Sequence, residues 1–524
     1  MKEFDYVIVG AGSAGCVLAA RLTEDPDVTV CLLEAGGSDR NLNVTIPAAF
    51  SKLFKGRRDW GYYSDPEPGL MGRRIYMPRG KMLGGSSSMN AMLYVRGNSA
   101  DYDGWAKAGA TGWSYDEVLP YFRKSENFAR GADHFHGVGG PLNVDDHRSR
   151  TRITELMVKA AIEAGFEFNS DYNGAEQTGV GYLQVNQKFG RRWSAADAWL
   201  RPAMSRKNLT VRTGAQSLGL VLEGDRAVGV RISTKHGPET VRAAGEVIMS
   251  AGSIGTPQLL MLSGIGDAEH LRSLGIDPIV DNPNVGAHLQ DHPFYLLNWE
   301  TTAKGTLAEA ESPKQLLNFL LRGRGLLTST VAEGTAFFPS HDGLAAPDLQ
   351  LHFGAAYFHN HGFDSYATPA FAMAPTLVAP QSRGQIRLRS ADPSAAPSIV
   401  GNHLTERADV DAMIAGVQRA RDIASQQALR GLTGKEIHPG AAVAGSAAIE
   451  ADLRRDTELI YHPTSTARMG SEDTGVVDEL LRVHGVTGLR VVDASVFPTI
   501  PRGNTNAATY MVAEKAADII RQAH

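Results

Sequence analysis

The sequence predicts an α/β protein built from more than one domain, and three observations support this prediction. The chain has 524 residues, which is longer than a single hydrophobic core normally organises. A β-branched run leads into a glycine-rich turn and a helical stretch near the N-terminus, the order expected for a parallel sheet covered by helices. Strand-like runs at Glu246–Ser250 and Leu489–Val492 are predicted to join the same sheet.

The first forty residues carry a dinucleotide-binding pattern. A predicted strand at Asp5–Val9 is followed by a G-x-G-x-x-G turn, a helix over Cys16–Thr23 and a second strand, Thr29–Leu33, which ends at Glu34. The glycines allow a tight bend and a close approach of the backbone to a pyrophosphate, and the acid suits ribose hydroxyls. Glu34 would repel a 2′-phosphate, so NADP is disfavoured, whereas NAD and FAD both stay open. We therefore predict a Rossmann-like domain whose dinucleotide lies on Gly10, Gly12, Gly15 and Glu34.

Composition and charge exclude several classes of protein. The net charge of −5 leaves no basic excess for a nucleic-acid backbone, and the hydrophobic fraction of 43% is ordinary for a globular protein. Cys16 and Cys31 are the only cysteines, so we expect no disulfide framework. We find no signal-peptide pattern and no apolar run of the roughly 18 residues that a spanning helix needs. A cytoplasmic protein without an integral membrane segment is expected.

One apolar stretch, Leu316–Leu327, allows two interpretations. It reads LLNFLLRGRGLL and carries Arg322 and Arg324 among its leucines. Its length and pattern favour an ordinary buried helix, and a peripheral membrane contact is the alternative.

A second glycine-rich segment, Pro78–Gly97, combines a flexible backbone with hydroxyl donors. It reads PRGKMLGGSSSMNAMLYVRG, and the apolar positions within it fit a buried ligand-binding loop better than a surface loop. This segment resembles the first signature of the glucose-methanol-choline (GMC) oxidoreductase family, and Gly252–Gly266 resembles the second. The resemblance runs from residue 4 to residue 520, in the family's order, through Leu119–Glu126, Asn284–His292, Tyr461–Gly470 and Leu489–Ile520.

The resemblance implies FAD as the dinucleotide. Beyond the first glycine motif, it implies contacts from Gly84, Gly85, Asn90, Ala91, Met92, Leu93, Asp493, Ala494 and Asn506. Some family members attach FAD covalently through a histidine of the first signature. Met89 stands at the matching position, and a thioether cannot form that link, so we expect non-covalent FAD.

The resemblance also implies oxidation of an alcohol to a carbonyl compound. That reaction removes the hydroxyl proton and passes the α-hydride to flavin N5. An imidazole suits the first task because its ordinary pKa of about 6.5 leaves it basic near neutral pH. His462, beside Pro463, matches the family's active-site histidine, and Asn504 matches a partner position that holds His or Asn. We expect His462 to act as the base and the Asn504 amide to donate to the alcohol oxygen.

Further residues are predicted to border the substrate. Asp348–Phe358 alternates as a strand does, and its family counterpart borders the substrate cavity. The predicted pocket residues are Phe353, Tyr357, Phe358, Tyr461 and Glu333, of which Glu333 either binds a cationic group or braces the pocket. No metal-binding pattern accompanies the polar group formed by His352, His359, His361 and Asp364, so no metal is expected.

These assignments imply a discontinuous nucleotide-binding domain. Residues 1–290 and 451–524 are expected to form the FAD-binding domain, with a β-rich excursion at Asn208–Arg242. Residues 291–450 mix strand-like runs with the helical stretch Asp409–Ala424. We expect them to form an α+β substrate domain with an antiparallel sheet.

Three functions stay open from the sequence. An alcohol oxidase or dehydrogenase is favoured, with a small, uncharged primary alcohol as substrate and oxygen or a quinone as electron acceptor. A choline dehydrogenase-like enzyme specific for a cationic alcohol is a variant of it. A lyase of the hydroxynitrile lyase type would use the same scaffold and histidine without redox turnover, and a non-catalytic flavin-binding module is the third possibility.

Overall fold

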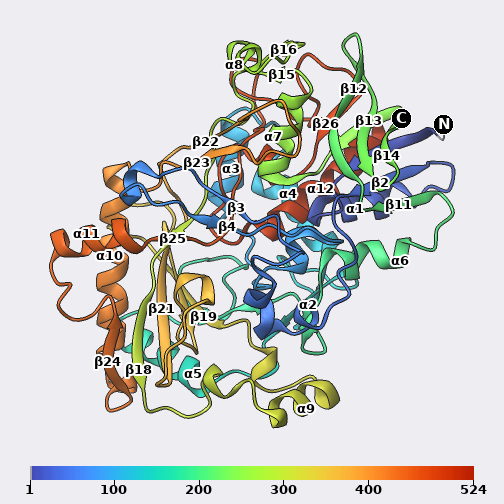
Figure 1. Ribbon diagram of the computed structural model, residues 1–524. Helices are drawn as coiled ribbons and strands as arrows, with labels where there is room; N and C mark the ends of the chain where they lie inside the picture. Colours follow the sequence, from blue (N-terminus) through green and yellow to red (C-terminus); the bar gives the residue numbers. More distant parts are fainter. Residues whose placement is uncertain (1–2, 524) are drawn as a thin grey trace.

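A mainly parallel sheet forms one layer of the protein (Figure 1), and the computed structural model describes residues 3–523. The parallel strands lie in the order β11 (Leu209–Thr213), β2 (Val30–Glu34), β1 (Glu3–Val9), β14 (Gly237–Met249) and β26 (Leu489–Val491). The centres of β1 and β2 are apolar and buried, as expected for strands covered on both faces. This layer confirms the predicted Rossmann-like sheet.

Two antiparallel strands extend this sheet on one side. β12 (Gln216–Glu223) pairs with β13 (Arg226–Thr234), and β13 pairs with the first half of β14. These strands form the predicted β-rich excursion. They leave the carboxyl end of β14 within the parallel part of the sheet, where it pairs with β1 and β26.

Helices from the two ends of the chain pack against each other beside this sheet (Figure 1). α1 (Ser13–Leu22) follows β1, and α12 (Thr505–Gln522) lies near the C-terminus. Arg21 donates to both carboxylate oxygens of Glu514, at 2.8 and 2.9 Å, and Glu514 is fully buried. A paired buried carboxylate of this kind ties the last turn of α1 to the middle of α12.

An antiparallel sheet of eight strands forms the second layer. Its main path runs β24-β18-β21-β20-β19-β7, and β17 and β25 pair at one end. Its strands are β7 (Gly179–Tyr182), β17 (Pro293–Phe294), β18 (Leu297–Thr301), β19 (Ala332–Phe338), β20 (Leu349–Gly354), β21 (Ala370–Leu377), β24 (Thr433–His438) and β25 (Glu458–Leu459). α5 (Arg152–Glu163) and α10 (Arg407–Ala424) pack against one face of this sheet. The antiparallel sheet expected from the sequence is confirmed.

The second sheet extends beyond the predicted range 291–450. β7 precedes that range by more than one hundred residues and pairs with β19, and β25 follows it. A four-residue strand such as β7 has too few alternating positions to be assigned to one sheet or another from its sequence. The proposed division at residues 290 and 451 stays a prediction.

The remaining helices and strands lie outside the two large sheets. The other helices are α2 (Leu42–Thr45), α3 (Ser99–Lys107), α4 (Tyr115–Ser125), α6 (Arg201–Ala203), α7 (Gly252–Leu262), α8 (Ala268–Ser273), α9 (Pro313–Arg322) and α11 (Ser446–Asp456). The other strands are β3 (Tyr62–Tyr63), β4 (Tyr76–Met77), β5 (Glu126–Phe128), β6 (Leu142–Asp146), β8 (Gln184–Val185), β9 (Gln187–Lys188), β10 (Arg191–Arg192), β15 (Ile265–Gly266), β16 (Val280–Asp281), β22 (Gln385–Arg387) and β23 (Ser398–Val400).

The apolar stretch at 316–327 begins as a helix, α9, but this helix is not buried. Phe319 is 1% exposed, whereas Leu317 and Leu321 are 58% and 75% exposed. The expectation of a buried helix is wrong, because the spacing of leucines defines an apolar face without showing that other parts of the chain cover it. The alternative of a membrane contact stays a prediction. Within residues 3–523, no helix combines the length and the apolar character needed to cross a bilayer.

Candidate active site

A cavity lies between the two sheets, at the carboxyl ends of the parallel strands. On the side of the first sheet its wall includes Gly10 after β1, Glu34 at the end of β2 and Ser250 after β14. On the opposite side it includes His352 and Gly354 of β20. Doubly wound sheets bind their ligands at this edge, because the loops there are free of the helices that cover the faces.

Close backbone contacts shape the first glycine turn. Gly10 has φ +100°, and a Cβ on Gly15 would lie 1.9 Å from the Gly10 carbonyl oxygen. Gly10 and Gly12 line the cavity, whereas Gly15 lies behind them where α1 meets the turn. Glu34 accepts hydrogen bonds from two backbone N–H groups, at 3.1 and 2.8 Å, and burial raises its pKa to about 7. The predicted motif and its acid therefore meet at one end of the cavity.

The second glycine loop lies directly against the first. Gly84 and Gly85 have φ +82° and +52°, and a Cβ on Gly85 would lie 2.7 Å from the Gly12 Cα. Arg192 then fixes the following segment by donating to the Asn90 carbonyl and side-chain oxygens, at 2.6 and 2.8 Å. Gly84 shapes the turn without lining the cavity, and the predicted positions that do line it are Gly85, Asn90, Ala91, Met92 and Leu93.

The predicted C-terminal positions also reach the cavity. Asp493 accepts hydrogen bonds from the Gly252 N–H at 2.9 Å and the Thr256 hydroxyl at 2.7 Å, which ties it to the start of α7, and Ala494 lines the wall beside it. Asn506 accepts from the Ser13 hydroxyl at 2.6 Å. Asn506 lies within the first turn of α12, which begins at Thr505.

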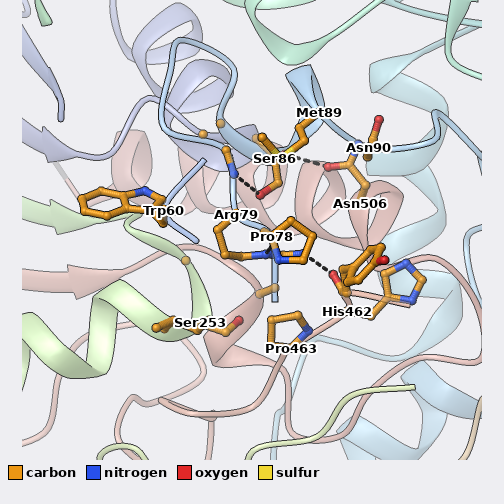
Figure 2. A pocket seen from close by; sticks show the side chains of 18 of the residues that line it. Trp60, Pro78, Arg79, Ser86, Met89, Asn90, Ser253, His462, Pro463 and Asn506 are labelled. Carbon is orange, nitrogen blue, oxygen red and sulfur yellow. Dashed lines mark hydrogen bonds between the residues drawn. The ribbon is translucent and has the colours of Figure 1, made fainter. Parts of the chain in front are cut away.

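His462 and Asn504 lie side by side in the cavity wall. The Asn504 Nδ2 atom is 3.2 Å from His462 Nε2, although the two residues are 42 positions apart in the chain. A neutral imidazole ring that accepts an amide N–H at Nε2 carries its own proton on Nδ1. Figure 2 shows His462 with Arg79 and Asn506 around the same cavity. The two residues predicted to carry the chemistry are thus in direct contact.

A neighbouring pair, Asp291 and His292, was not singled out from the sequence. His292 Nδ1 lies 3.0 Å from His462 Nδ1, and with this tautomer it accepts a hydrogen bond from the N–H of His462. The Asp291 carboxylate accepts from the backbone N–H groups of both histidines, at 2.8 and 2.7 Å. Both residues belong to the family-like segment Asn284–His292, which was the available signal, but nothing in it shows which histidine faces His462.

Burial keeps the histidines around the cavity neutral. It lowers the pKa of His462 well below its ordinary value, and the nearby His292 and the Arg79 guanidinium lower it further. Burial likewise lowers the pKa of His292 to about 3 and that of His352 to about 4. Because an imidazole accepts a proton only in its neutral form, His462 is available as a base at neutral pH.

Several buried polar atoms in the cavity wall are suited to a polar ligand. Among the described residues, Ser253 Oγ, His352 Nε2 and Asn504 Oδ1 have no hydrogen-bond partner, and all three residues line the cavity. Buried polar atoms are normally paired. A dinucleotide at the glycine turns, with its ring system beside His462 and Asn504, fits this set of donors and acceptors.

Comparison with known proteins identifies the family. Residues 4–294 and 380–513 match the N-terminal and C-terminal models described as GMC oxidoreductase. The chain belongs to the GMC oxidoreductase family. It is 41% identical to an alcohol dehydrogenase (acceptor) of Pseudomonas putida, over 99% of this chain and 95% of the relative. It is also 41% identical to the mitochondrial choline dehydrogenase of Homo sapiens, over 99% of this chain and 90% of the relative.

A solved structure supports the same assignment. The crystal structure of pyridoxine 4-oxidase from Mesorbium loti superimposes with a TM-score of 0.92 and 31% identity, covering 100% of both chains. This GMC oxidoreductase is therefore an FAD-dependent enzyme that acts on CH–OH groups, and the cavity described above is the place where the glycine motifs and the polar wall fit FAD.

Three of the predicted pocket residues of this GMC oxidoreductase, Phe353, Tyr357 and Glu333, do not line the cavity. His352 and Gly354 occupy the cavity side of β20, so Phe353 points to the other face, where it lies with Val158 of α5 around Gly334. The predicted strand Asp348–Phe358 is confirmed only as far as Gly354, where β20 ends, and alternation alone does not show which set of side chains faces inward. Tyr357 stacks on Tyr366 with ring centroids 5.3 Å apart, outside the cavity wall.

The remaining predictions for the pocket have different outcomes. Tyr461 lines the cavity, and its hydroxyl lies 2.7 Å from His361 Nδ1. Phe358 also lines the cavity. Glu333 is fully buried away from it and accepts from the Thr151 backbone N–H at 2.8 Å and from the Thr154 hydroxyl at 2.9 Å. These donors lie at the start of α5, so the Glu333 carboxylate braces this helix and does not meet the substrate.

Gly12→Val is expected to weaken FAD binding while the fold is kept. A Cβ at this position would meet only the Ser250 carbonyl oxygen, at 3.9 Å, so the apoprotein has room for it, but the added methyl groups enter the cavity where the pyrophosphate must approach the backbone. We expect a loss of at least about tenfold in FAD affinity, or about 1.4 kcal/mol. Titration of the apoprotein with FAD measures this affinity. Gly37→Val, where a Cβ meets nothing within 4 Å, is the matched control, and equal affinity in both variants would contradict the assignment.

Proposed function

We propose that this enzyme oxidises an uncharged primary alcohol to a carbonyl compound, with His462 as the base that removes the hydroxyl proton. The observation that carries the proposal is the contact between His462 Nε2 and the Asn504 amide at 3.2 Å in the cavity wall. When bound, FAD supplies the acceptor for the α-hydride of the alcohol. Every other requirement of the reaction is assigned to side chains of the protein.

The alcohol oxygen is proposed to insert between the two side chains. In the described state the Asn504 N–H points at the His462 Nε2 lone pair, so a hydroxyl at this position would accept from Asn504 and donate to His462. The proton then moves to Nε2, while Asn504 stabilises the negative charge that develops on oxygen. His292 accepts from the other ring nitrogen of His462, which keeps the Nε2 lone pair directed at the substrate.

The charge distribution around His462 favours an uncharged substrate. Among the described residues of the wall, the carboxylates are Glu34 and Asp493, and both already accept backbone hydrogen bonds beside the glycine motifs. Arg79 places a cation beside Tyr461 and His462. Besides the uncharged polar residues named above, the wall includes apolar and aromatic side chains, among them Phe50, Phe54, Phe294, Leu296 and Phe358. In the wall itself a trimethylammonium group would meet a guanidinium and no free carboxylate, because the Asp291 carboxylate near Arg79 is buried behind the wall and accepts from two backbone N–H groups.

The enzyme is therefore expected to prefer the neutral carbon isostere of choline, in which a tert-butyl group replaces the trimethylammonium group, over choline itself. The two alcohols share their shape, so charge alone separates them. Repulsion by Arg79 is expected to favour the isostere by at least about tenfold in kcat/KM, which corresponds to about 1.4 kcal/mol. Steady-state kinetics with an artificial electron acceptor measures the ratio. Faster turnover of choline would instead support a choline dehydrogenase-like specificity.

Non-covalent attachment of FAD is also proposed. Met89 lies at the position where related enzymes carry a linking histidine, and the thioether cannot form that bond. Acid precipitation is expected to leave the yellow colour in the supernatant and a colourless protein pellet. A pellet that stays yellow would contradict the proposal and would point to a different attachment residue.

The electron acceptor is proposed to be oxygen or a quinone. Parallel assays of one alcohol with dissolved oxygen and with a quinone analogue distinguish an oxidase from a dehydrogenase. Hydrogen peroxide formed at the rate of alcohol consumption would assign the oxidase, and turnover only with the quinone analogue would assign the dehydrogenase.

A further inference from the structure

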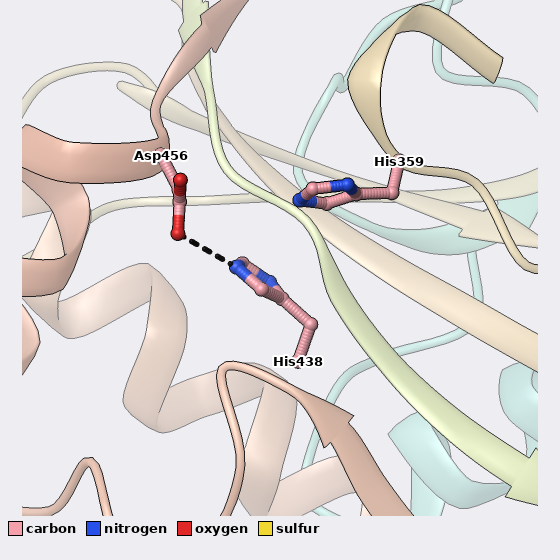
Figure 3. Close-up of side chains that lie close together, drawn as sticks. All are labelled: His359, His438 and Asp456. Carbon is pink, nitrogen blue, oxygen red and sulfur yellow. Dashed lines mark hydrogen bonds and ion pairs between the residues drawn. The ribbon is translucent and has the colours of Figure 1, made fainter. Parts of the chain in front are cut away.

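Three side chains far apart in the sequence converge on one point outside the active site. His359 lies in the connection that follows β20, His438 ends β24 and Asp456 ends α11. One ligand atom from each of the three lies within 4.8 Å of the others, and the two imidazole rings have centroids 4.9 Å apart. Figure 3 shows the two rings and the carboxylate turned toward a common space. All three residues are partly exposed, so an ion from solvent can reach them.

The hydrogen bonds behind the two histidines orient them as ligands. His438 Nδ1 lies 2.5 Å from the Leu296 carbonyl oxygen, and His359 Nδ1 lies 2.7 Å from an Asp364 carboxylate oxygen. A carbonyl and a carboxylate only accept, so each Nδ1 carries a proton. His359 Nε2 then holds a lone pair in the neutral ring, and His438 Nε2 does so once a cation replaces the proton that it shares with Asp456. This arrangement, a ligating nitrogen backed by a hydrogen-bonded Nδ1, is the one that metal-binding histidines use.

The spacing of the ligand atoms also suits a small divalent cation. His438 Nε2 lies 3.1 Å from Asp456 Oδ2. Two ligand atoms about 2.0 Å from a tetrahedral Zn²⁺ lie about 3.3 Å apart. A neutral imidazole nitrogen and a carboxylate oxygen both carry lone pairs, so they approach this closely only with a proton or a cation between them. Asp452 Oδ1 lies 4.0 Å from His438 Nε2 and already accepts from the Tyr295 hydroxyl at 2.6 Å, so it completes the set by a small movement that shares or breaks this hydrogen bond.

A second cluster of similar composition has one imidazole only, and that imidazole is buried. His136 lies between Glu126 and Asp171, with Nδ1 3.0 Å from one carboxylate and Nε2 2.9 Å from the other. His438 likewise has an acceptor at each nitrogen, but His136 is fully buried and its cluster offers no second imidazole, so it is closed to an ion from solvent. The cluster is a buried charge network that also includes Arg96, and it serves as an internal contrast.

We propose that His359, His438 and Asp456 form a structural site for a divalent transition metal of the Zn²⁺ class. Two imidazoles and one carboxylate are the ligand types that Zn²⁺ accepts, with Asp452 or water in the fourth position. The sequence suggested no metal here, because these ligands come from three separate segments and the nearby residues considered together, His352 and His361, point elsewhere. Phe358 next to His359 lines the cavity, so a bound ion would brace part of the active-site wall.

Calorimetric titration of the chelator-treated, FAD-loaded enzyme with ZnCl₂ tests the proposal. We expect binding of about one ion per chain and a rise in Tm with added Zn²⁺. His359→Ala and Asp456→Asn are expected to weaken binding by at least about tenfold. Asp364→Asn, which removes the carboxylate that accepts from His359 Nδ1, is expected to weaken Zn²⁺ binding by about 10- to 100-fold. The control is His341→Ala, because this exposed histidine hydrogen-bonds the carbonyl oxygen of its neighbour Asp342 and does not belong to the cluster.

The controls separate loss of the site from loss of the fold. Each variant should keep the flavin spectrum and the chelator-treated Tm of the parent enzyme. Absence of Zn²⁺ binding in the parent, or binding that persists unchanged in both His359→Ala and Asp456→Asn, would overturn the proposal. In that case His438 and Asp456 form only an ion pair. Neither outcome bears on the alcohol chemistry, which uses other residues.

Discussion

Replacement of His462 by alanine is expected to lower kcat/KM for a primary alcohol by roughly 10²- to 10⁴-fold, the usual effect of losing a general base. The physical reason is that the neutral His462 Nε2 is the proton acceptor placed beside the Asn504 amide in the cavity wall. No other described residue contacts Asn504 Nδ2 in this way. Steady-state kinetics with a saturating electron acceptor measures the effect.

Loss of the base must be separated from loss of the cofactor. The His462→Ala enzyme should bind FAD with the affinity of the parent, and added imidazole should restore part of the rate by taking the place of the missing ring. His403→Ala is a matched control, because His403 is also a buried histidine with its pKa lowered, to about 4, but it does not line the cavity. Near-normal turnover by His462→Ala would remove this residue from the mechanism.

Replacement of Asn504 by alanine is expected to lower kcat by about 10²- to 10³-fold, as for other donors that stabilise a developing oxyanion. Asn504 precedes α12, but its side chain makes no capping hydrogen bond, so little stability should be lost with it. Its amide instead contacts His462, and the effect should therefore fall on turnover and not on Tm. Kinetics and thermal unfolding of the same preparation measure both quantities.

A histidine at position 504 provides the companion variant. Asn504→His restores an N–H donor at the position where the family carries His or Asn, so it should recover most of the activity lost in Asn504→Ala. If both variants lose activity together with FAD or with several degrees of Tm, Asn504 has a structural role and the proposed donor function is contradicted.

Much of the catalytic half of the site could be predicted from the sequence. His462 and Asn504 lie in C-terminal stretches with family-like neighbours, and the first glycine motif is local, so its strand, turn and helix are set by residues next to one another. The structure brings the glycine motifs, Glu34 and Asp493 to one cavity, although they are hundreds of residues apart in the chain.

The predictions that were wrong depend on contacts between distant parts of the chain, which a short stretch of sequence does not show. Alternation in β20 identified a strand but did not show which of its two faces borders the cavity. Phe353 was therefore predicted to line the cavity, whereas its neighbour His352 does so. The leucines of α9 were expected to be covered, and they face solvent. The contact between His292 and His462 joins two segments 170 residues apart, and 16 histidines offer too many pairings to choose from by composition.

The most direct test of hydride transfer assisted by His462 is anaerobic mixing of the FAD-loaded enzyme with an uncharged primary alcohol while flavin absorbance is followed. We predict rapid bleaching in the parent enzyme, with one aldehyde formed for each flavin reduced, and bleaching slowed by roughly 10²- to 10⁴-fold in His462→Ala. A flavin that keeps its colour while product is released would indicate a lyase. Neither bleaching nor product with any alcohol would indicate a binding module, and equal bleaching rates in the two enzymes would contradict the role of His462.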